Sequence, residues 1–167
     1  SQSSSLLLQG AIDINCIGTP TISWYGITLI GDITFEGCEL SLFGGGVFGE
    51  TSIESSESSI IKFSNLFVSV VDKGEPIEFA SVSLDGTEGN NEITSAITDL
   101  DGIANLRAKS ITYNSSGVFE DENLDRIVTM QIDSLGVSQT DYWDVSYSSE
   151  KSFIASTVNS DEVFNYL

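Results

Sequence analysis

The sequence of 167 residues contains no histidine and only six basic residues, with two cysteines, two prolines and one methionine. Without histidine, the chain cannot build a Ser–His or Cys–His pair, an imidazole general base or a metal site with His ligands. The six Lys and Arg stand against 25 Asp and Glu, which gives a formal charge of −19. Because such a surface repels phosphate groups, nucleic acid is excluded as a partner.

Long hydrophobic runs are also missing. Runs such as those at residues 6–8 and 60–61 fall far short of the roughly 20 residues that cross a bilayer, so we expect no membrane span. A hydrophobic content of 40% is nevertheless ordinary for globular proteins and suffices for one large or two small domains. Since the first residue is Ser1 and not Met, we expect either a secretory protein that has lost its signal peptide or a fragment.

The two cysteines, Cys16 and Cys38, lie in strand-like segments and lack the CxxC spacing of redox or metal motifs. We expect a disulfide bond between neighbouring strands, with two buried free thiols as the alternative. A disulfide indicates an extracellular or cell-surface location. Asn114, followed by Ser115 and Ser116, forms an N-glycosylation sequon in a predicted loop and is the candidate modification site.

Alternation of apolar and polar residues between Gly, Asn and Asp turns predicts an all-β fold. In residues 1–64 the predicted strands are very short (27–30, 33–35, 38–43, 47–48 and 51–53), and turns of one to three residues separate them. This pattern is typical of the rungs of a parallel β-helix, or of a tightly wound meander. Counting finds no fixed period.

The second predicted domain, residues 65–167, has longer strands and clearer alternation. In the segment 77–84, for example, Ala80, Val82 and Leu84 share one face. The strands expected in this domain cover residues 66–71, 77–84, 92–98, 103–108, 126–133, 142–147, 152–158 and 163–167.

The second predicted domain resembles the carboxypeptidase regulatory-like family in three successive sequence patterns. They are D-x-G-x-P-I, A-x-V-x-L and T-D-x-D-G-x-A-x-L. The resemblance implies a small immunoglobulin-like β-sandwich of the kind that closes prokaryotic surface β-helix proteins, without chemistry of its own. It covers roughly residues 59–158, and Glu75 between Gly74 and Pro76 is within its normal variation. The matching residues are Asp72, Gly74, Pro76, Ile77, Ala80, Val82, Leu84, Thr98, Asp99, Asp101, Gly102, Ala104 and Leu106.

Asp99 and Asp101, in the run Asp-Leu-Asp-Gly, are the candidate metal ligands, because alternate carboxylates can converge on calcium. The rest of an EF-hand loop is absent, and the competing interpretation is a hairpin turn in which Asp caps backbone N–H groups. The acidic loop 120–125 is a second candidate cation or partner site, with a solvated loop as the alternative. We therefore predict no cofactor, apart from calcium as an option.

The sequence marks out no pair of carboxylates for glycoside hydrolysis, so we predict that the protein is not an enzyme. Trp24 and Trp143 each stand next to a tyrosine, an arrangement that suits sugar stacking, although core packing is the commoner role. Gly44–Gly46 lacks the lysine and the helix of a phosphate loop and predicts a sharp turn.

The strand-like segment 6–14 begins very near the first residue, and we predict that it pairs with another subunit through Leu6, Leu8, Ile12 and Ile14. The functional hypothesis is a non-catalytic subunit of an extracellular filament, sheath or surface layer, a homo-polymer joined by strand exchange. The alternative is an adhesion or glycan-binding module of a cell-surface protein. With 19 net negative charges per subunit, a polymer should require salt or divalent cations.

Overall fold

The computed structural model describes residues 6–17, 20–44, 46–48, 51–53, 58–86, 88–120 and 124–155. These residues form strands, turns and one 3-10 turn, η1 (Asp133–Leu135), without an α-helix. The predicted all-β fold class is therefore confirmed. Within the same residues, no helix has the length and hydropathy that crossing a membrane would require.

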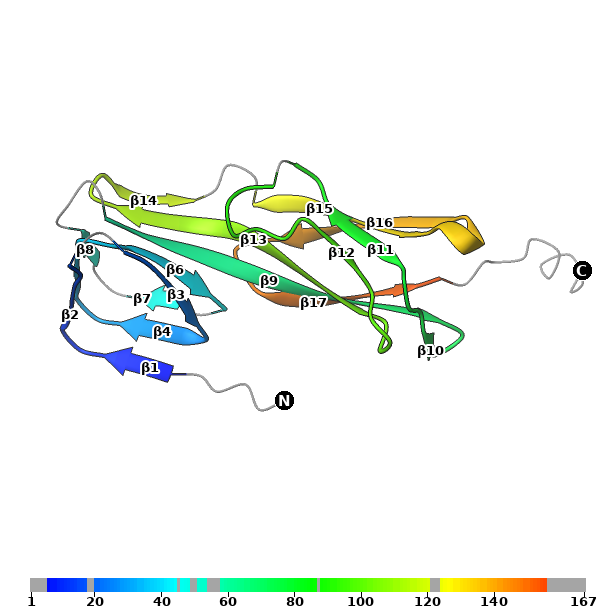
Figure 1. Cartoon of the computed structure of the whole chain (residues 1–167), viewed down its shortest axis with the longest axis horizontal. Helices are drawn as coiled ribbons and strands as arrows, with labels where there is room; N and C mark the ends of the chain where they lie inside the picture. The colour runs from blue at the N-terminus through cyan, green and yellow to red at the C-terminus, as the bar shows by residue number, and fades with distance from the viewer. Residues whose placement is uncertain are drawn as a thin grey trace, which may run out of the picture.

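The strands fall into four hydrogen-bonded sheets, and two long strands run through most of the molecule (Figure 1). Within the described residues the strands are β1 (Leu6–Gln9), β2 (Ile12–Asn15), β3 (Thr21–Tyr25), β4 (Ile27–Ile30), β5 (Ile33–Glu36), β6 (Glu39–Phe43), β7 (Gly46–Phe48), β8 (Thr51–Ile53), β9 (Ser59–Asp72), β10 (Glu75–Pro76), β11 (Ser81–Leu84), β12 (Ser95–Ile97), β13 (Ile103–Asn114), β14 (Gly117–Glu120), β15 (Asp125–Ile132), β16 (Val137–Asp144) and β17 (Ser149–Ile154).

The first nine strands wind into three rungs of three strands each. Strands β1, β4 and β7 form one parallel sheet, β2, β5 and β8 a second, and β3, β6 and β9 lie side by side in a third. Leu6 pairs with Ile27 and Thr28 with Gly46, so successive turns of this winding take 21 and 18 residues. We call this part, residues 6–63, the solenoid.

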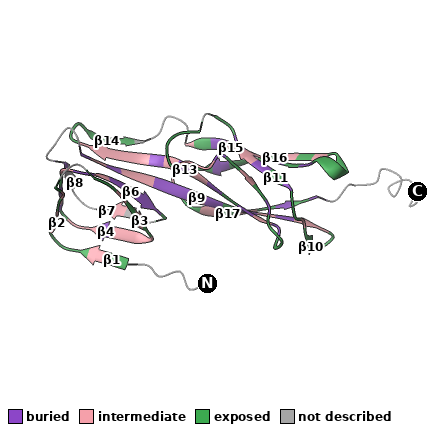
Figure 2. Cartoon of the chain, viewed as in Figure 1, coloured by how far each residue is buried: buried purple, intermediate pink, exposed green. Residues whose placement is uncertain are grey.

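The interior of the solenoid is filled by columns of apolar side chains, one residue from each rung. Leu8 lies above Leu29, and Ile14 above Phe35, in the hydrogen-bonded register. Leu29 and Phe35, in the second rung, have no exposed surface. Burial is deeper in this middle rung than in the first because its side chains have neighbours both above and below. In Figure 2, its strand β6 is coloured mostly as buried.

Two corners of the second rung require glycine. Gly31 and Gly37 have φ values of 122° and 79°, in the region that side chains other than glycine avoid. A Cβ atom at Gly31 would collide with the carbonyl oxygen of Gly10, and one at Gly37 with that of Cys16. The corners of adjacent rungs can therefore stack only because these residues lack side chains.

The other half of the molecule is a β-sandwich. The four-stranded sheet β12-β11-β15-β16 packs on the part of the other sheet formed by β9, β13 and β17. Trp143 on β16 is 1% exposed, and its indole Nε1 donates to the Tyr147 carbonyl at 2.9 Å. The buried residues of the sandwich core are Leu66, Val68, Val70, Ala80, Val82, Leu84, Ala104, Leu106, Ala108, Val128, Met130, Ile132, Trp143, Val145, Phe153 and Ala155.

The solenoid and the sandwich share two strands, β9 and β13, which pair antiparallel along almost their whole length. The predicted domain boundary at residues 64 and 65 lies inside β9. Ile60 packs in the solenoid core and Leu66 in the sandwich core, so the two cores meet at this point of the strand. Within the described residues, the connection is a continuous ladder of backbone hydrogen bonds and not a linker.

A β-bulge in β13 marks the same junction. The register shifts between Lys109 and Ile111, and the Lys109 N–H donates to Glu92 Oε1 at 2.8 Å. The Ser110 hydroxyl lies 3.2 Å from the Lys62 carbonyl oxygen, to which it donates. Burial lowers the pKa of Lys62, whose Nζ donates to the Ser146 carbonyl at 3.2 Å. These contacts fix the strands where the two cores meet.

Two predicted strands are shorter in the structure: the one at residues 92–98 is reduced to β12, and the one at residues 77–84 to β11. The pattern in residues 77–84 predicts a single strand, but β11 begins at Ser81 because Phe79 has a φ value of 64°. Thr98 stabilises this break: its hydroxyl accepts the Ala80 N–H at 2.8 Å and donates to the Ile77 carbonyl at 2.7 Å. The alternation of Ala80, Val82 and Leu84 toward the core is present as predicted.

Candidate interaction surface

The first rung leaves one end of the solenoid core uncovered by the other described residues. Strands β1, β2 and β3 each pair on one side only, with β4, β5 and β6. Trp24 and Ile14 are only partly buried, whereas Leu42 and Phe35, their register partners in the second rung, have no exposed surface. In Figure 2 the ribbon of β1 is coloured as exposed and intermediate. The rung therefore presents apolar side chains beside unpaired backbone groups.

This edge is almost free of charge. In a chain with 31 charged residues, the segment 6–26 contains one, Asp13. Leu6, Leu7 and Tyr25 are 52%, 55% and 64% exposed. Natural sheet edges are usually protected by lysines, prolines or bulges, because unpaired strands add to one another. The first rung has little of this protection.

The far end of the solenoid differs, because part of the extended strand β13 packs against it. Tyr113 on β13 contacts the solenoid core, and burial raises the pKa of its hydroxyl. Strand β14 then pairs with β13 and forms the outer edge of the same sheet. Among the described strands, this sheet therefore has β3 at one edge and β14 at the other.

The four residues predicted to contact another subunit all lie in the first rung. Leu6 and Leu8 belong to β1, which pairs with β4, and Ile12 and Ile14 belong to β2, which pairs with β5. Leu8, Ile12 and Ile14 face the core of their own solenoid. The strands that carry these residues thus already pair within their own chain. Another molecule can reach only the unpaired backbone groups on the other side of β1 and β2.

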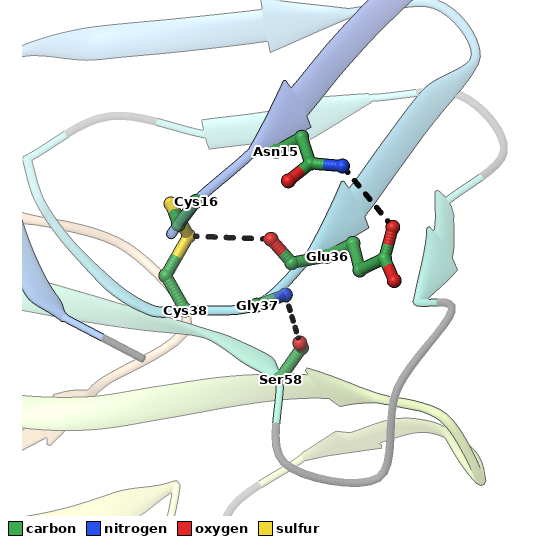
Figure 3. The surroundings of a disulfide bond; sticks show 6 residues. All are labelled: Asn15, Cys16, Glu36, Gly37, Cys38 and Ser58. Carbon is green, nitrogen blue, oxygen red and sulfur yellow. Dashed lines mark hydrogen bonds between the residues drawn. A yellow bond between two sulfur atoms is a disulfide. The ribbon is translucent and has the colours of Figure 1, made fainter. Parts of the chain in front are cut away.

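The predicted disulfide bond between Cys16 and Cys38 is confirmed. It joins the corner after β2 to the corresponding corner after β5, so it links the first rung to the second (Figure 3). Beside it, the Asn15 amide donates to Glu36 Oε2 at 3.2 Å, and the Gly37 N–H donates to the Ser58 hydroxyl at 2.8 Å. The bond therefore opposes separation of the first rung from the rest of the solenoid.

The candidate metal ligands Asp99 and Asp101 lie in the turn between β12 and β13. Asp99 Oδ1 accepts the backbone N–H groups of Asp101 and Ile103 at 3.0 and 2.9 Å, and Gly102 has a φ value of 71°. The Asp101 residue is exposed. These are the contacts of the capped hairpin turn that the sequence offered as the alternative, and among the described residues no group of three or more potential metal ligands gathers.

The remaining predicted sites lie in or near loops. Asn114 ends β13, and its side-chain oxygen accepts the Ser116 N–H at 2.8 Å in the turn to β14. Asp125 is exposed at the start of β15, while residues 121–123 of the acidic loop lie outside the described residues. Of the two tryptophans considered for sugar stacking, Trp143 is in the sandwich core and Trp24 faces the solenoid core.

A polar depression of about 500 Å³ lies between the loop after β11 and strands β9 and β13. Of the two carboxylates that line it, Glu39 and Glu92, the second accepts the backbone N–H groups of Gly89 and Lys109 at 2.6 and 2.8 Å. Arg126, 6% exposed, bonds Asp85 Oδ1 at 3.2 Å and the Asp85 carbonyl. Both side chains therefore hold the loop in place.

The sequence reasoning missed an aromatic stack on the outer face of the solenoid. Tyr25, Phe43 and Phe63 occupy equivalent positions in β3, β6 and β9, with ring centroids 4.8 and 5.0 Å apart. The Arg107 guanidinium lies 4.2 Å from the centre of the Phe43 ring. The signal is the spacing of these aromatics, 18 and 20 residues, which equals one turn of the solenoid in each case.

No family model matches the chain, and none of the curated proteins compared with it matches either.

Proposed function

We propose that this chain is a non-catalytic structural subunit of an extracellular or cell-surface assembly, and that copies join by strand addition at the open edge of the first rung. The observation that carries the proposal is the first rung itself. It combines unpaired backbone groups, exposed leucines and a near absence of charge in an otherwise strongly acidic chain. Such an edge favours pairing with another strand over solvation.

Two further features support this proposal. The Cys16–Cys38 disulfide suits an oxidising compartment and makes the first rung a fixed template instead of a frayed end. The carboxypeptidase regulatory-like resemblance of the second half also favours a surface module. In the depression beside β13, Glu92 and Arg126 are engaged in structural hydrogen bonds, which favours an architectural role for these two side chains.

The charge of the chain sets the conditions for assembly. Each subunit brings a net −19, and this repulsion extends about 30 Å at 0.01 M salt but only about 8 Å at 0.15 M. Electron microscopy and light scattering should therefore find multi-subunit assemblies at 0.15 M salt or with calcium. Assembly should be lost at low ionic strength with a chelator.

A single lysine tests whether the first rung is the contact. Ser23 on β3 is exposed, so Ser23→Lys adds a charge to the edge without removing any buried group. We expect this variant to stay monomeric where the wild type assembles. Leu100→Lys is the control, since Leu100 is 77% exposed in a turn of the sandwich. A wild-type protein that is monomeric at all salt and calcium concentrations would overturn the proposed function.

A further inference from the structure

We propose that the two free edges of the long sheet are partners: strand β14 of one copy pairs with strand β3 of the next, and repetition of this contact builds an open filament. The inference rests on the proposed function and adds the surface that the first rung recognises. Among the described strands, the order β14-β13-β9-β6-β3 places β3 and β14 at opposite edges of one sheet. Each has a hydrogen-bonded neighbour on one side only.

The strand directions allow this pairing without turning one copy over. Strands β3, β6 and β9 are parallel, β13 is antiparallel to β9, and β14 is antiparallel to β13. Strand β14 therefore runs in the same direction as β3. A second copy displaced along the sheet would meet β14 with its own β3 in the parallel arrangement already used in the solenoid. The contact joins two different surfaces and does not close on itself, which is the condition for a filament.

The faces of the two strands also match. Following the register across the sheet, Phe119 lies on the same face as Ser23 and Tyr25, and Val118 on the same face as Trp24. When Phe119 of one copy lies beside Tyr25 of the next, Val118 lies beside Trp24. The outer aromatic stack would then continue across the contact, and the apolar side of β14 would lie over the β3 side of the open solenoid core.

Low charge and exposed apolar side chains occur at both of these edges. Residues 14–31, which contain β3, form the longest stretch of the chain without a charged residue, and residues 110–119 before the end of β14 are also uncharged. Tyr25, Val118 and Phe119 are 64%, 60% and 49% exposed. Strand β14 itself ends in Glu120, but β3 carries no charge that would repel this carboxylate. Two edges with so little charge and with exposed apolar side chains can approach where acidic surfaces would repel each other. The occupant of each edge is accordingly a second copy of the chain.

The geometry fixes a repeat distance. Each copy contributes five strands to the continuous sheet, β3, β6, β9, β13 and β14. With strands about 4.8 Å apart, the rise per subunit along the sheet is about 24 Å. Electron microscopy of the assembled wild-type protein should find a subunit repeat near this value.

Complementary edge variants provide the test. Ser23→Lys blocks β3 and leaves β14 intact, whereas Phe119→Lys blocks β14 and leaves β3 intact. Each variant alone should be monomeric by size-exclusion chromatography with light scattering. An equimolar mixture should form a one-to-one dimer, because one free β3 edge and one free β14 edge remain. Tyr25→Lys and Val118→Lys are a second pair, and far-ultraviolet circular dichroism checks that all four variants fold.

Each other outcome overturns the pairing. If the Phe119→Lys variant still dimerises alone, first rungs pair with each other. If the mixture stays monomeric, β14 is not the partner of β3. Tyr147→Lys, at a side chain that is 70% exposed and distant from both edges in the sequence, should assemble like the wild type. If the wild type assembles but the mixture does not, only this inference fails. If the wild type never assembles, the proposed function fails as well.

Discussion

The disulfide between Cys16 and Cys38 provides a direct test of the energetics of the solenoid. The two cysteines are 22 residues apart, which is close to one turn of the winding. In the chain-entropy model, closing a loop of this length removes about 11 cal/mol/K from the unfolded state, or about 3.4 kcal/mol at 25 °C. Reduction of the bond deletes no side chain, so this entropy is the main quantity that changes.

The two tryptophans allow the effect to be located. Trp24 faces the solenoid core and Trp143 lies in the sandwich core. Urea denaturation should be followed by fluorescence with and without reductant, in a Trp143→Phe background that reports on the solenoid and in a Trp24→Phe background that reports on the sandwich. We expect reduction to lower the free energy of unfolding seen by Trp24 by about 3 kcal/mol.

The result that would refute this reasoning is equally specific. An unchanged Trp24 transition after complete reduction, verified by thiol titration, would mean that the first rung is held by its hydrogen bonds and packing alone. A change confined to the Trp143 reporter would mean that the bond acts outside the solenoid. If both reporters shift together, the shared strands β9 and β13 make the two halves unfold as one unit.

Three other predictions concern the sandwich. Asp85→Asn leaves the buried Arg126 without its carboxylate partner and should cost about 2 kcal/mol in urea denaturation. Asp99→Ala removes the acceptor of two backbone N–H groups and should lower the free energy of unfolding by about 1 kcal/mol. Asp101→Ala should change it by no more than about 0.5 kcal/mol. A calcium-dependent rise in Tm that Asp101→Ala abolishes would instead identify a metal site. A hydrogen bond from Lys151 lowers the pKa of Asp141. The stability that this pair contributes should therefore be present above the ordinary Asp pKa and be lost as the pH falls through the lowered value. Asp141→Asn should remove this loss of stability at acid pH, an effect of less than about 1 kcal/mol because the pair is exposed.

The sequence is sufficient to predict the fold class and the disulfide because both depend on local patterns. Alternating apolar residues identify strands, and two cysteines without CxxC spacing favour one bond. The sequence also allows both interpretations of Asp99, because a carboxylate just before a glycine turn can either bind a cation or cap backbone N–H groups. The contacts in the structure are those of the capped turn.

The winding of the solenoid could not be counted from the sequence because its corners differ in length. The turn from Leu6 to Ile27 takes 21 residues, while the turn from Thr21 to Glu39 takes 18, so equivalent residues do not recur at a constant interval. The aromatic stack is hidden for the same reason, since its spacing is meaningful only once the length of each turn is known. The continuity of β9 across the two halves was missed because the change of sequence pattern near residue 64 resembles a boundary between domains.

The distribution of charge connects the fold to the proposed assembly. The acidic surfaces of two copies repel each other over most of the molecule, and this repulsion disfavours lateral contacts between those surfaces. The edge at β3, which has no charged residue, and the edge at β14, whose one charged residue is Glu120, are places where two copies can approach with little of this repulsion. A net charge of −19 would then restrict association to the edge-to-edge direction. Raising the salt concentration should accordingly favour edge contacts first, and only much higher ionic strength should permit lateral bundling of filaments.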